Sequence, residues 1–547
     1  MSQGTLSSVP AWRTAFEAAE QDPENLQLWE TLIGLTTQHG ANDIDNTRIV
    51  FDKLLAKFPL LFGYWIQYAI IEADFLKKNK QENKDDTVIS VYERAVSAFP
   101  TSFDLWTHYG TYLVESHRNS HEKIRSVFTR GIKSSGRDFL SHPLWDAYIE
   151  FEESIEKESV EVAEILKAVV QYPLHQYARY YEKCSIVAEK FPSVFQDMDL
   201  NDVFTNTQIG TNDRWAFESQ INRSYFHVID LDPDQILNWN NYLDYEESQG
   251  DVAQIQFLYE RALVPCALYE DFWLRYARWA AANTDENSIL GTETVTNIYR
   301  RAALVFIPLN RPYIRLHWSL YEESRGNVDF ARDILDSYQN SAPTDLLEEI
   351  CHSRIQFERR QGDSEFIDKE LEADRTTKNE KTRAVLIAHK ALHIWHVEGD
   401  VDSARKLFQV YQFEDFALSS CPFFINYFKF ELSQASRTKS LKYIHNLWKF
   451  IVFRTAIPLP VVNDLSESYL EFLRLEGFFK EYLEVDTETH GPFSVQKLHR
   501  LKLGGEPFIT KRLKFINEHP GVEIDMVSVR YEGLDPLEKY LKDQQNV

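Results

Sequence analysis

The chain has 547 residues, 14% of which are aromatic, but it holds just 19 glycines and 19 prolines. Few chain breakers and many aromatic residues argue against collagen-like, disordered and all-β classes and predict helices with bulky packing faces. The formal net charge of −25 disfavours non-specific binding to a phosphate backbone, which makes proteins the favoured partners and local basic patches the alternative.

The first 174 residues carry a recurring aromatic pattern. Trp65, Trp106 and Trp145 each begin the form W-x-x-Y, and a looser copy begins at Trp29. The steps between these positions are 36, 41 and 39 residues, a period typical of stacked helical hairpins. The sequence therefore predicts an N-terminal array of hairpins over residues 1–174.

The repeat period breaks over residues 175–233. We call the first position of each copy of the pattern its slot, and the slots at Trp145 and Trp239 are 94 residues apart. Residues 195–213 are polar and poor in helix signals, so they predict a loop. We interpret 175–233 as an irregular connecting region, within which Tyr181 and Phe217 are weak copies of the slot.

A second array is predicted over residues 234–485, where the pattern returns at a similar period. Several Gly-Asp or Gly-Asn pairs lie between the two halves of a unit, where glycine suits the end of the first helix and Asp or Asn can cap the second. The slots of this array begin at residues 239, 273, 315, 351, 388, 424 and 469. The predicted fold is thus an all-α solenoid of helical hairpins in two arrays.

A glutamate often stands seven residues after the slot, as in Glu152 and Glu246. Seven residues return to within about 20° of the starting face of a helix, so this carboxylate should lie on the packed side. A buried carboxylate needs a partner. We expect it to accept hydrogen bonds from a neighbouring Tyr or Trp, or to pair with an arginine of a second helix such as Arg261.

Residues 400–490 are dense in aromatic side chains. Ordinary hairpin core accounts for some of them, and the excess suggests an additional contact, so we place a candidate dimer surface there. Its members are Phe423, Phe424, Tyr427, Tyr443, Trp448 and Phe453.

Residues 486–547 are rich in Gly and Pro and predict an irregular C-terminal tail. The tail contains a locally basic run in which Glu506 is the single acid. This run is a candidate contact for RNA or a partner, with docking onto the acidic array of the same chain as an equal alternative. Its residues are Lys497, Arg500, Lys502, Lys511, Arg512 and Lys514.

Catalytic and cofactor motifs such as GxxxxGK[ST], GxGxxG, HExxH and GxSxG are missing, so we expect no enzyme activity and no cofactor. His389, His393 and His396 fall near one helical face, but no familiar ligand spacing is completed, so packing or surface roles are favoured over a metal site. Four distant cysteines, no signal-peptide pattern and no membrane-length apolar run indicate a reduced, intracellular protein.

The hairpin pattern resembles the HAT repeat (half-a-tetratricopeptide), which is TPR-like. Longer stretches resemble the pre-mRNA-processing factor 39 family, and with the repeat register the resemblance extends to about residue 476. These stretches are Phe58-Pro-Leu-Leu-Phe-Gly-Tyr-Trp65, Phe139-Leu-Ser-His-Pro-Leu-Trp145, Pro173-Leu-His-Gln-Tyr-Ala-Arg179, Arg214-Trp-Ala-Phe-Glu218, Tyr225-Phe-His-Val228 and Cys266-Ala-Leu-Tyr-Glu-Asp-Phe-Trp273.

This resemblance implies a nuclear, non-catalytic scaffold subunit of the U1 small nuclear ribonucleoprotein that supports 5′ splice-site recognition in pre-mRNA splicing. It implies contacts with U1 proteins, with protein C and the 70-kDa protein as the expected partners, and only indirect or minor RNA contact. It also implies a homodimer or a heterodimer with a HAT-repeat paralogue. The alternatives are a HAT-repeat subunit of the mRNA 3′-end processing machinery and a direct RNA-binding protein that uses residues 497–514.

Overall fold

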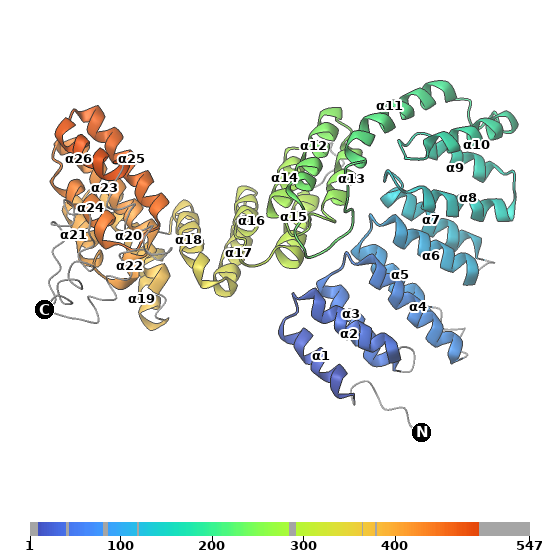
Figure 1. The fold of residues 1–547 in the computed structure, drawn as a ribbon, viewed down its shortest axis with the longest axis horizontal. Coiled ribbons are helices and arrows are strands. Elements are labelled where there is room, and N and C mark those ends of the chain that lie inside the picture. The colour runs from blue at the N-terminus through green and yellow to red at the C-terminus, as the bar shows by residue number, and fades with distance from the viewer. Residues whose placement is uncertain are drawn as a thin grey trace, which may run out of the picture. The chain divides into compact units, whose positions relative to one another are not determined.

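Every regular element that the structure describes is helical, which confirms the predicted all-α class (Figure 1). None of the described helices is long and apolar enough to cross a membrane. The structure is a computed structural model, and it describes residues 9–39, 43–79, 86–116, 120–283, 292–363, 365–377 and 380–491.

The chain divides into two compact units, Met1–Pro308 and Leu309–Val547. This division falls at Pro308, whereas the sequence suggested a break within 175–233. The described helices of the first unit are α1 (Pro10–Gln21), α2 (Leu26–His39), α3 (Ile44–Lys57), α4 (Phe62–Lys78), α5 (Asp86–Ala98), α6 (Phe103–Ser116), α7 (His121–Ser135), α8 (His142–Ile155), α9 (Val160–Val169), α10 (Tyr177–Lys190), α11 (Leu200–Glu218), α12 (Pro233–Gln249), α13 (Val252–Ala262), α14 (Glu270–Ala282) and α15 (Thr292–Arg301).

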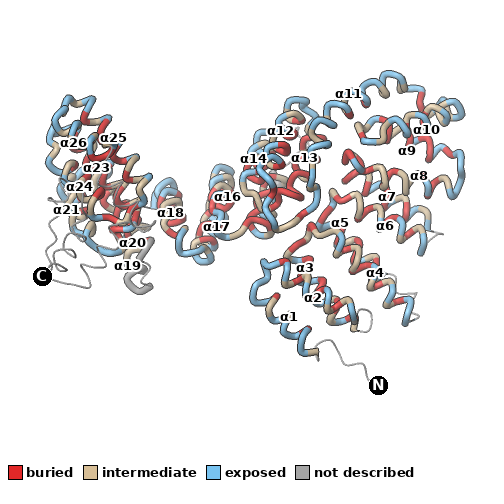
Figure 2. The backbone as a smooth tube through the Cα atoms, in the orientation of Figure 1, coloured by how far each residue is buried: buried red, intermediate tan, exposed pale blue. Residues whose placement is uncertain are grey.

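The second unit continues the succession of hairpins. Its described helices are α16 (Tyr313–Ser324), α17 (Val328–Ser341), α18 (Leu347–Gln361), α19 (Phe366–Thr377), α20 (Glu380–His393), α21 (Val401–Tyr411), α22 (Asp415–Leu418), α23 (Cys421–Thr438), α24 (Lys442–Arg454), α25 (Leu459–Glu476) and α26 (Phe479–His490). Within each unit, buried residues lie along the faces where neighbouring helices meet (Figure 2). This repeated pairing agrees with the predicted HAT solenoid.

Several slot tryptophans form a hydrogen bond with the loop that precedes their own helix. In four hairpins the indole Nε1 donates a hydrogen bond to the backbone carbonyl six residues earlier, which is a proline carbonyl in three of them. The pairs are Trp29 to Pro23 (3.0 Å), Trp65 to Pro59 (2.9 Å), Trp106 to Pro100 (2.8 Å) and Trp273 to Ala267 (2.8 Å). The indole therefore buries its apolar body while its single donor is satisfied.

The tyrosine three residues later stacks on an aromatic residue of the preceding second helix. Nearly parallel rings meet in this way along the chain, so these aromatic residues pack one hairpin against the next. The pairs are Phe51–Tyr68, Tyr92–Tyr109, Phe128–Tyr148, Phe217–Tyr242, Tyr259–Tyr276 and Phe408–Tyr427, with ring centroids 4.6–5.1 Å apart.

The loop predicted for residues 195–213 is wrong from Leu200 onward, because α11 begins there. Asp199 caps this helix by accepting hydrogen bonds from the backbone N–H groups of Asn201 and Asp202. The buried residues of α11 are threonines, Thr207 and Thr211, so the helix lacks the apolar stripe that sequence reasoning looks for. Helices α10 and α11 form one more hairpin, so the expected irregular region is largely helical.

Two Gly-Asp turns confirm the predicted division between the halves of a unit. Gly250 and Gly399 have φ values of 80° and 75°, in the left-handed region that glycine adopts without strain. Asp251 and Asp400 then cap the following helix, each accepting hydrogen bonds from two backbone N–H groups. These turns set where the second helix of each hairpin begins.

Candidate protein-interaction surfaces

The glutamate seven residues after the slot is buried and held by an arginine in five hairpins, as the sequence predicted. The arginine belongs to the second helix of the preceding hairpin and donates a hydrogen bond to each carboxylate oxygen. The Nε–Oε1 distances are 2.6 Å for Arg48–Glu72, 2.7 Å for Arg125–Glu152, Arg214–Glu246 and Arg405–Glu431, and 2.8 Å for Arg332–Glu358.

The tryptophan alternative also occurs, at Glu322. Its carboxylate accepts hydrogen bonds from Trp318 Nε1 at 3.2 Å and from Asn327 Nδ2 at 2.7 Å. At Glu358 two arginines favour the ionised form of the carboxyl. Burial opposes ionisation there, but hydrogen bonds from Arg332 and Arg354 lower the pKa of the carboxyl. The arginine-bound carboxylates therefore join neighbouring hairpins, whereas Glu322 is held within its own hairpin.

Arg261, the example given for such a second-helix arginine, does not bind a glutamate seven residues after a main slot, and Arg214 is the partner of Glu246. Arg261 instead lies between Glu218 of α11 and Asp138 of the loop after α7, with Nε 2.9 Å from the Asp138 carboxylate. All three side chains are almost fully buried. Burial is the largest influence on Arg261, but the two carboxylates outweigh it and raise its pKa.

Stretches that carry the family resemblance meet inside the first unit. The backbone N–H of His175 donates to the carbonyl of Phe139 at 2.9 Å, and both rings lie near Trp215, with centroids 5.6 and 6.3 Å from it. Phe58 contacts Phe226 at a centroid distance of 6.1 Å. The resemblance therefore rests on residues that join distant hairpins of this unit.

An apolar groove opens beside the Phe58–Phe226 contact. It has a volume of about 230 Å³ and includes Phe62 and Tyr64 at the start of α4 together with Tyr225, whose side chain is 52% exposed. An exposed aromatic residue at the edge of an apolar groove is typical of protein-interaction surfaces. Both stretches carry the family resemblance, and the structure adds that they lie side by side.

Four of the six residues proposed for the dimer surface cannot reach a partner. Phe423, Phe424, Tyr427 and Trp448 are buried in the apolar core of the second unit, so hairpin packing explains the density of aromatics. Phe453 is half-buried against the same core, and Tyr443 is 41% exposed. Of the proposed set, Tyr443 remains the most accessible member.

Sequence reasoning missed an exposed apolar stripe at the end of the described chain. Phe479 and Leu483, one turn apart on α26, are each 64% exposed, and Leu475 at the end of α25 is 75% exposed. The four-residue spacing of Phe479 and Leu483, about one helical turn, was a visible signal, but the region beyond Glu476 carries no copy of the repeat. Exposed apolar side chains on one helix face make α26 a candidate interface.

Two more sets of residues stand out in the sequence, the basic run of the C-terminal tail and the histidines of α20. The basic residues Lys497, Arg500, Lys502, Lys511, Arg512 and Lys514 lie outside the described residues. His389 packs against His352, with Nδ1 of His352 and Nε2 of His389 2.8 Å apart. No group of three or more His, Cys, Asp or Glu side chains that could hold a metal occurs in the described part of the chain.

Comparisons with known proteins agree with this architecture. The family profiles described as PRP39 N-terminal HAT repeat and PRP39 C-terminal HAT repeat match residues 13–185 and 212–360. Pre-mRNA-processing factor 39 of Schizosaccharomyces pombe is 32% identical and covers 98% of this chain and 96% of its own length. The human protein of that name is 25% identical over 73% of this chain and 65% of its own length.

Among solved structures, the crystal structure of CSTF-77 is similar, with a TM-score of 0.52 and 13% identity. The match covers 83% of this chain and 95% of that chain. At this level of identity the similarity shows a shared solenoid fold alone.

Proposed function

Because this chain belongs to the pre-mRNA-processing factor 39 family, we propose that it is a nuclear, non-catalytic scaffold of the U1 small nuclear ribonucleoprotein in pre-mRNA splicing. In this role it bridges particle proteins and supports 5′ splice-site recognition. The observation that carries the proposal is the 32% identity to a pre-mRNA-processing factor over 98% of the chain.

The construction of the hairpins supports a scaffold role. The buried carboxylates of the repeat are engaged by arginines of the neighbouring hairpin, so they stiffen the array and are not free acids or bases. The groove between the start of α4 and Tyr225 offers a surface for a particle protein. The U1 C protein and the 70-kDa protein are the proposed partners.

We further propose that the chain dimerises, with itself or with a HAT-repeat paralogue, through the end of the second unit. The exposed side chains there are Leu475, Phe479 and Leu483, and Tyr443 is the accessible member of the aromatic set. These replace the buried aromatics as the residues to test. Apolar side chains at an interface core supply most of the association free energy.

Purification of the tagged chain from nuclear extract tests the scaffold role. U1 RNA and U1 proteins should co-purify, and release of the RNA by nuclease should leave the U1 proteins bound. Recovery of 3′-end processing factors in their place would contradict the proposal. A Tyr225→Glu variant should lose particle proteins, whereas Tyr313→Glu, the same change at an equally exposed tyrosine of the second unit, should retain them.

Direct RNA binding is the second candidate and needs its own assay. If residues 497–514 carried the function, the isolated chain would bind naked RNA with a steep dependence on salt concentration. Reversal of Lys511, Arg512 and Lys514 to glutamate would then abolish association with the particle. The scaffold proposal instead expects binding to assembled particle and weak binding to naked RNA.

A further inference from the structure

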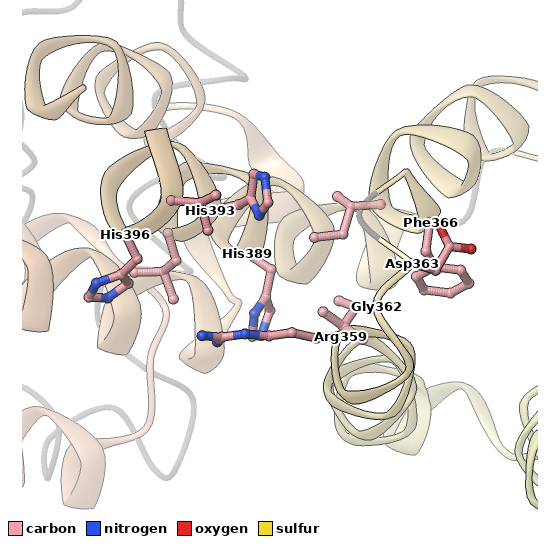
Figure 3. A pocket seen from close by; sticks show the side chains of 11 residues that line it. Arg359, Gly362, Asp363, Phe366, His389, His393 and His396 are labelled. Carbon is pink, nitrogen blue, oxygen red and sulfur yellow. The ribbon is translucent and has the colours of Figure 1, made fainter. Parts of the chain in front are cut away.

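A small pocket opens in the second unit between the α18–α19 turn and the end of α20 (Figure 3). Its volume is about 170 Å³. Apolar side chains form part of its lining, and an arginine and three histidines supply most of the polar part. The apolar members are Ile355, Phe366, Ile367, Leu392 and Val397, and the basic members are Arg359, His389, His393 and His396.

Two local features of the backbone build this pocket. Gly362 ends α18 in the left-handed conformation with φ 84°, which turns the chain sharply toward Phe366. On the opposite side, α20 continues as a π-helical segment, Ile394–Glu398, which carries His396 and Val397. Single π turns inside helices often occur at functional sites. Val397 is 66% exposed although it lines the pocket.

The polar wall of the pocket is positively charged. Arg359 makes no ion pair with any described residue, whereas its neighbour Arg360 binds Glu323. The one acidic member, Asp363, accepts a hydrogen bond from the backbone N–H of Glu365 and lies 3.8 Å from Lys369, which also lies 3.4 Å from Glu365. A guanidinium with no ion-pair partner among the described residues favours an anionic ligand.

His389 lines this wall as an uncharged residue. Its ring contacts His352, and Figure 3 shows the Arg359 side chain beside it. Burial, together with His352 and Arg359, lowers the pKa of His389 to about 4. The imidazole is therefore neutral at physiological pH, and Arg359 carries the fixed positive charge of this wall.

The size of the pocket limits its occupant. A cavity of about 150 Å³ accommodates benzene, and drug-sized ligands need about 300–1,000 Å³. A space of about 170 Å³ therefore admits one leucine- or phenylalanine-sized side chain. A peptide that fits this pocket would place one apolar side chain inside it and a neighbouring carboxylate on Arg359.

We propose that this pocket binds a short acidic segment of a partner protein, with one apolar side chain of the segment between Phe366 and Val397 and a neighbouring carboxylate on Arg359. This inference goes beyond the U1 assignment and does not depend on it, because any acidic segment with an apolar anchor satisfies the same geometry.

Fluorescence anisotropy of the full chain tests the proposal with a labelled Glu-Asp-Glu-Leu-Phe-Asp-Glu-Asp peptide. We expect saturable binding that Arg359→Glu and Val397→Glu each weaken by about tenfold or more. The control Arg474→Glu makes the same charge change at an exposed arginine of α25 and should leave binding unchanged. A peptide with Ser-Ser in place of Leu-Phe should bind at least about tenfold more weakly.

Several results would overturn the proposal. These are no binding up to about 1 mM peptide, equal losses for Arg359→Glu and Arg474→Glu, or equal binding of the Ser-Ser peptide. A labelled uridine decamer that binds the chain and loses affinity on both Val397→Glu and Arg359→Glu would assign the pocket to RNA. Circular dichroism of each variant should match the parent chain, and the milder Arg359→Gln variant should also weaken peptide binding.

Discussion

Arg261 and Asp138 form a buried ion pair, in which the guanidinium Nε of α13 lies 2.9 Å from a carboxylate oxygen in the loop after α7. The same guanidinium binds Glu218 and lies over the ring of Trp239, with Cζ 5.7 Å from the ring centroid. One side chain therefore joins elements that are widely separated in the sequence. Its removal has consequences at three places in the first unit.

Arg261→Ala should lower the free energy of unfolding of the first unit by about 3–5 kcal/mol, because Asp138 and Glu218 would remain buried without a counter-charge. Urea unfolding of the full chain, monitored by far-ultraviolet circular dichroism, measures this change. The exposed Arg474→Ala variant should stay within about 0.5 kcal/mol of the parent. A stability for Arg261→Ala equal to that of Arg474→Ala would contradict the structural role.

Two glycines should respond oppositely to the same substitution. A Cβ at Gly110 of α6 would lie 2.4 Å from the ring of Phe128, so Gly110→Ala should destabilise the unit by about 1–3 kcal/mol. A Cβ at Gly34 of α2 would enter open space, with no neighbouring side chain within 4 Å, so Gly34→Ala should stabilise the chain by about 0.5–1 kcal/mol. Thermal unfolding midpoints of the two variants on either side of the parent value are the expected outcome.

Stability should fall in mild acid because of His389. Its pKa is lowered to about 4 by burial, so its stabilising neutral form is complete above its ordinary pKa near 6.5 and is lost as the pH falls toward about 4. The loss should reach up to ~3 kcal/mol across this window. Urea midpoints of the parent and His389→Gln at pH 7.5 and pH 5 should show a smaller pH effect in the variant.

His490 supplies the opposite control for this experiment. Hydrogen bonds to Asp486 and Glu467 raise its pKa, so its contribution is present at low pH and is lost as the pH rises. His490→Gln should therefore leave the acid-side loss of stability in place. If His389→Gln and His490→Gln gave the same pH profile, the assignment to His389 would fail.

The apolar stripe at the end of the second unit predicts a change in oligomeric state. At micromolar concentration the parent chain should scatter light as a dimer, twice 64.2 kDa, when no paralogue is present. Phe479→Glu combined with Leu483→Glu should give the monomer mass, because two charges would enter an apolar interface. Ile186→Glu changes an exposed isoleucine of the first unit and should leave the dimer intact; a parent chain that is already monomeric would refute self-association.

The sequence predicted the hairpins well where aromatic residues fill the slots. Trp65 and Trp145 are buried in the core, and Glu72 and Glu152, seven residues after them, are buried on the same packed face as predicted. Helix α11 was missed because its buried residues are Thr207 and Thr211, which leave no hydrophobic period to detect.

The candidate sites were harder to predict than the fold. Burial depends on which helix lies opposite, so Phe423 and Tyr443 looked equivalent in the sequence although one is core and the other is exposed. The partner of Arg261 could not be found by local spacing either, because Asp138 lies in a distant hairpin of the same unit. The pocket at Arg359 likewise requires two helices whose contact the sequence does not specify.

The arginine–glutamate pairs cross from one hairpin to the next, and this affects how the protein can be divided for experiments. A fragment that began at residue 230 would carry Glu246 without Arg214 and Arg261 without Asp138 or Glu218. A cut between α11 and α12 would thus divide the charged pairs although it broke no helix. Fragments that keep both members of each pair are the ones expected to retain their native partners.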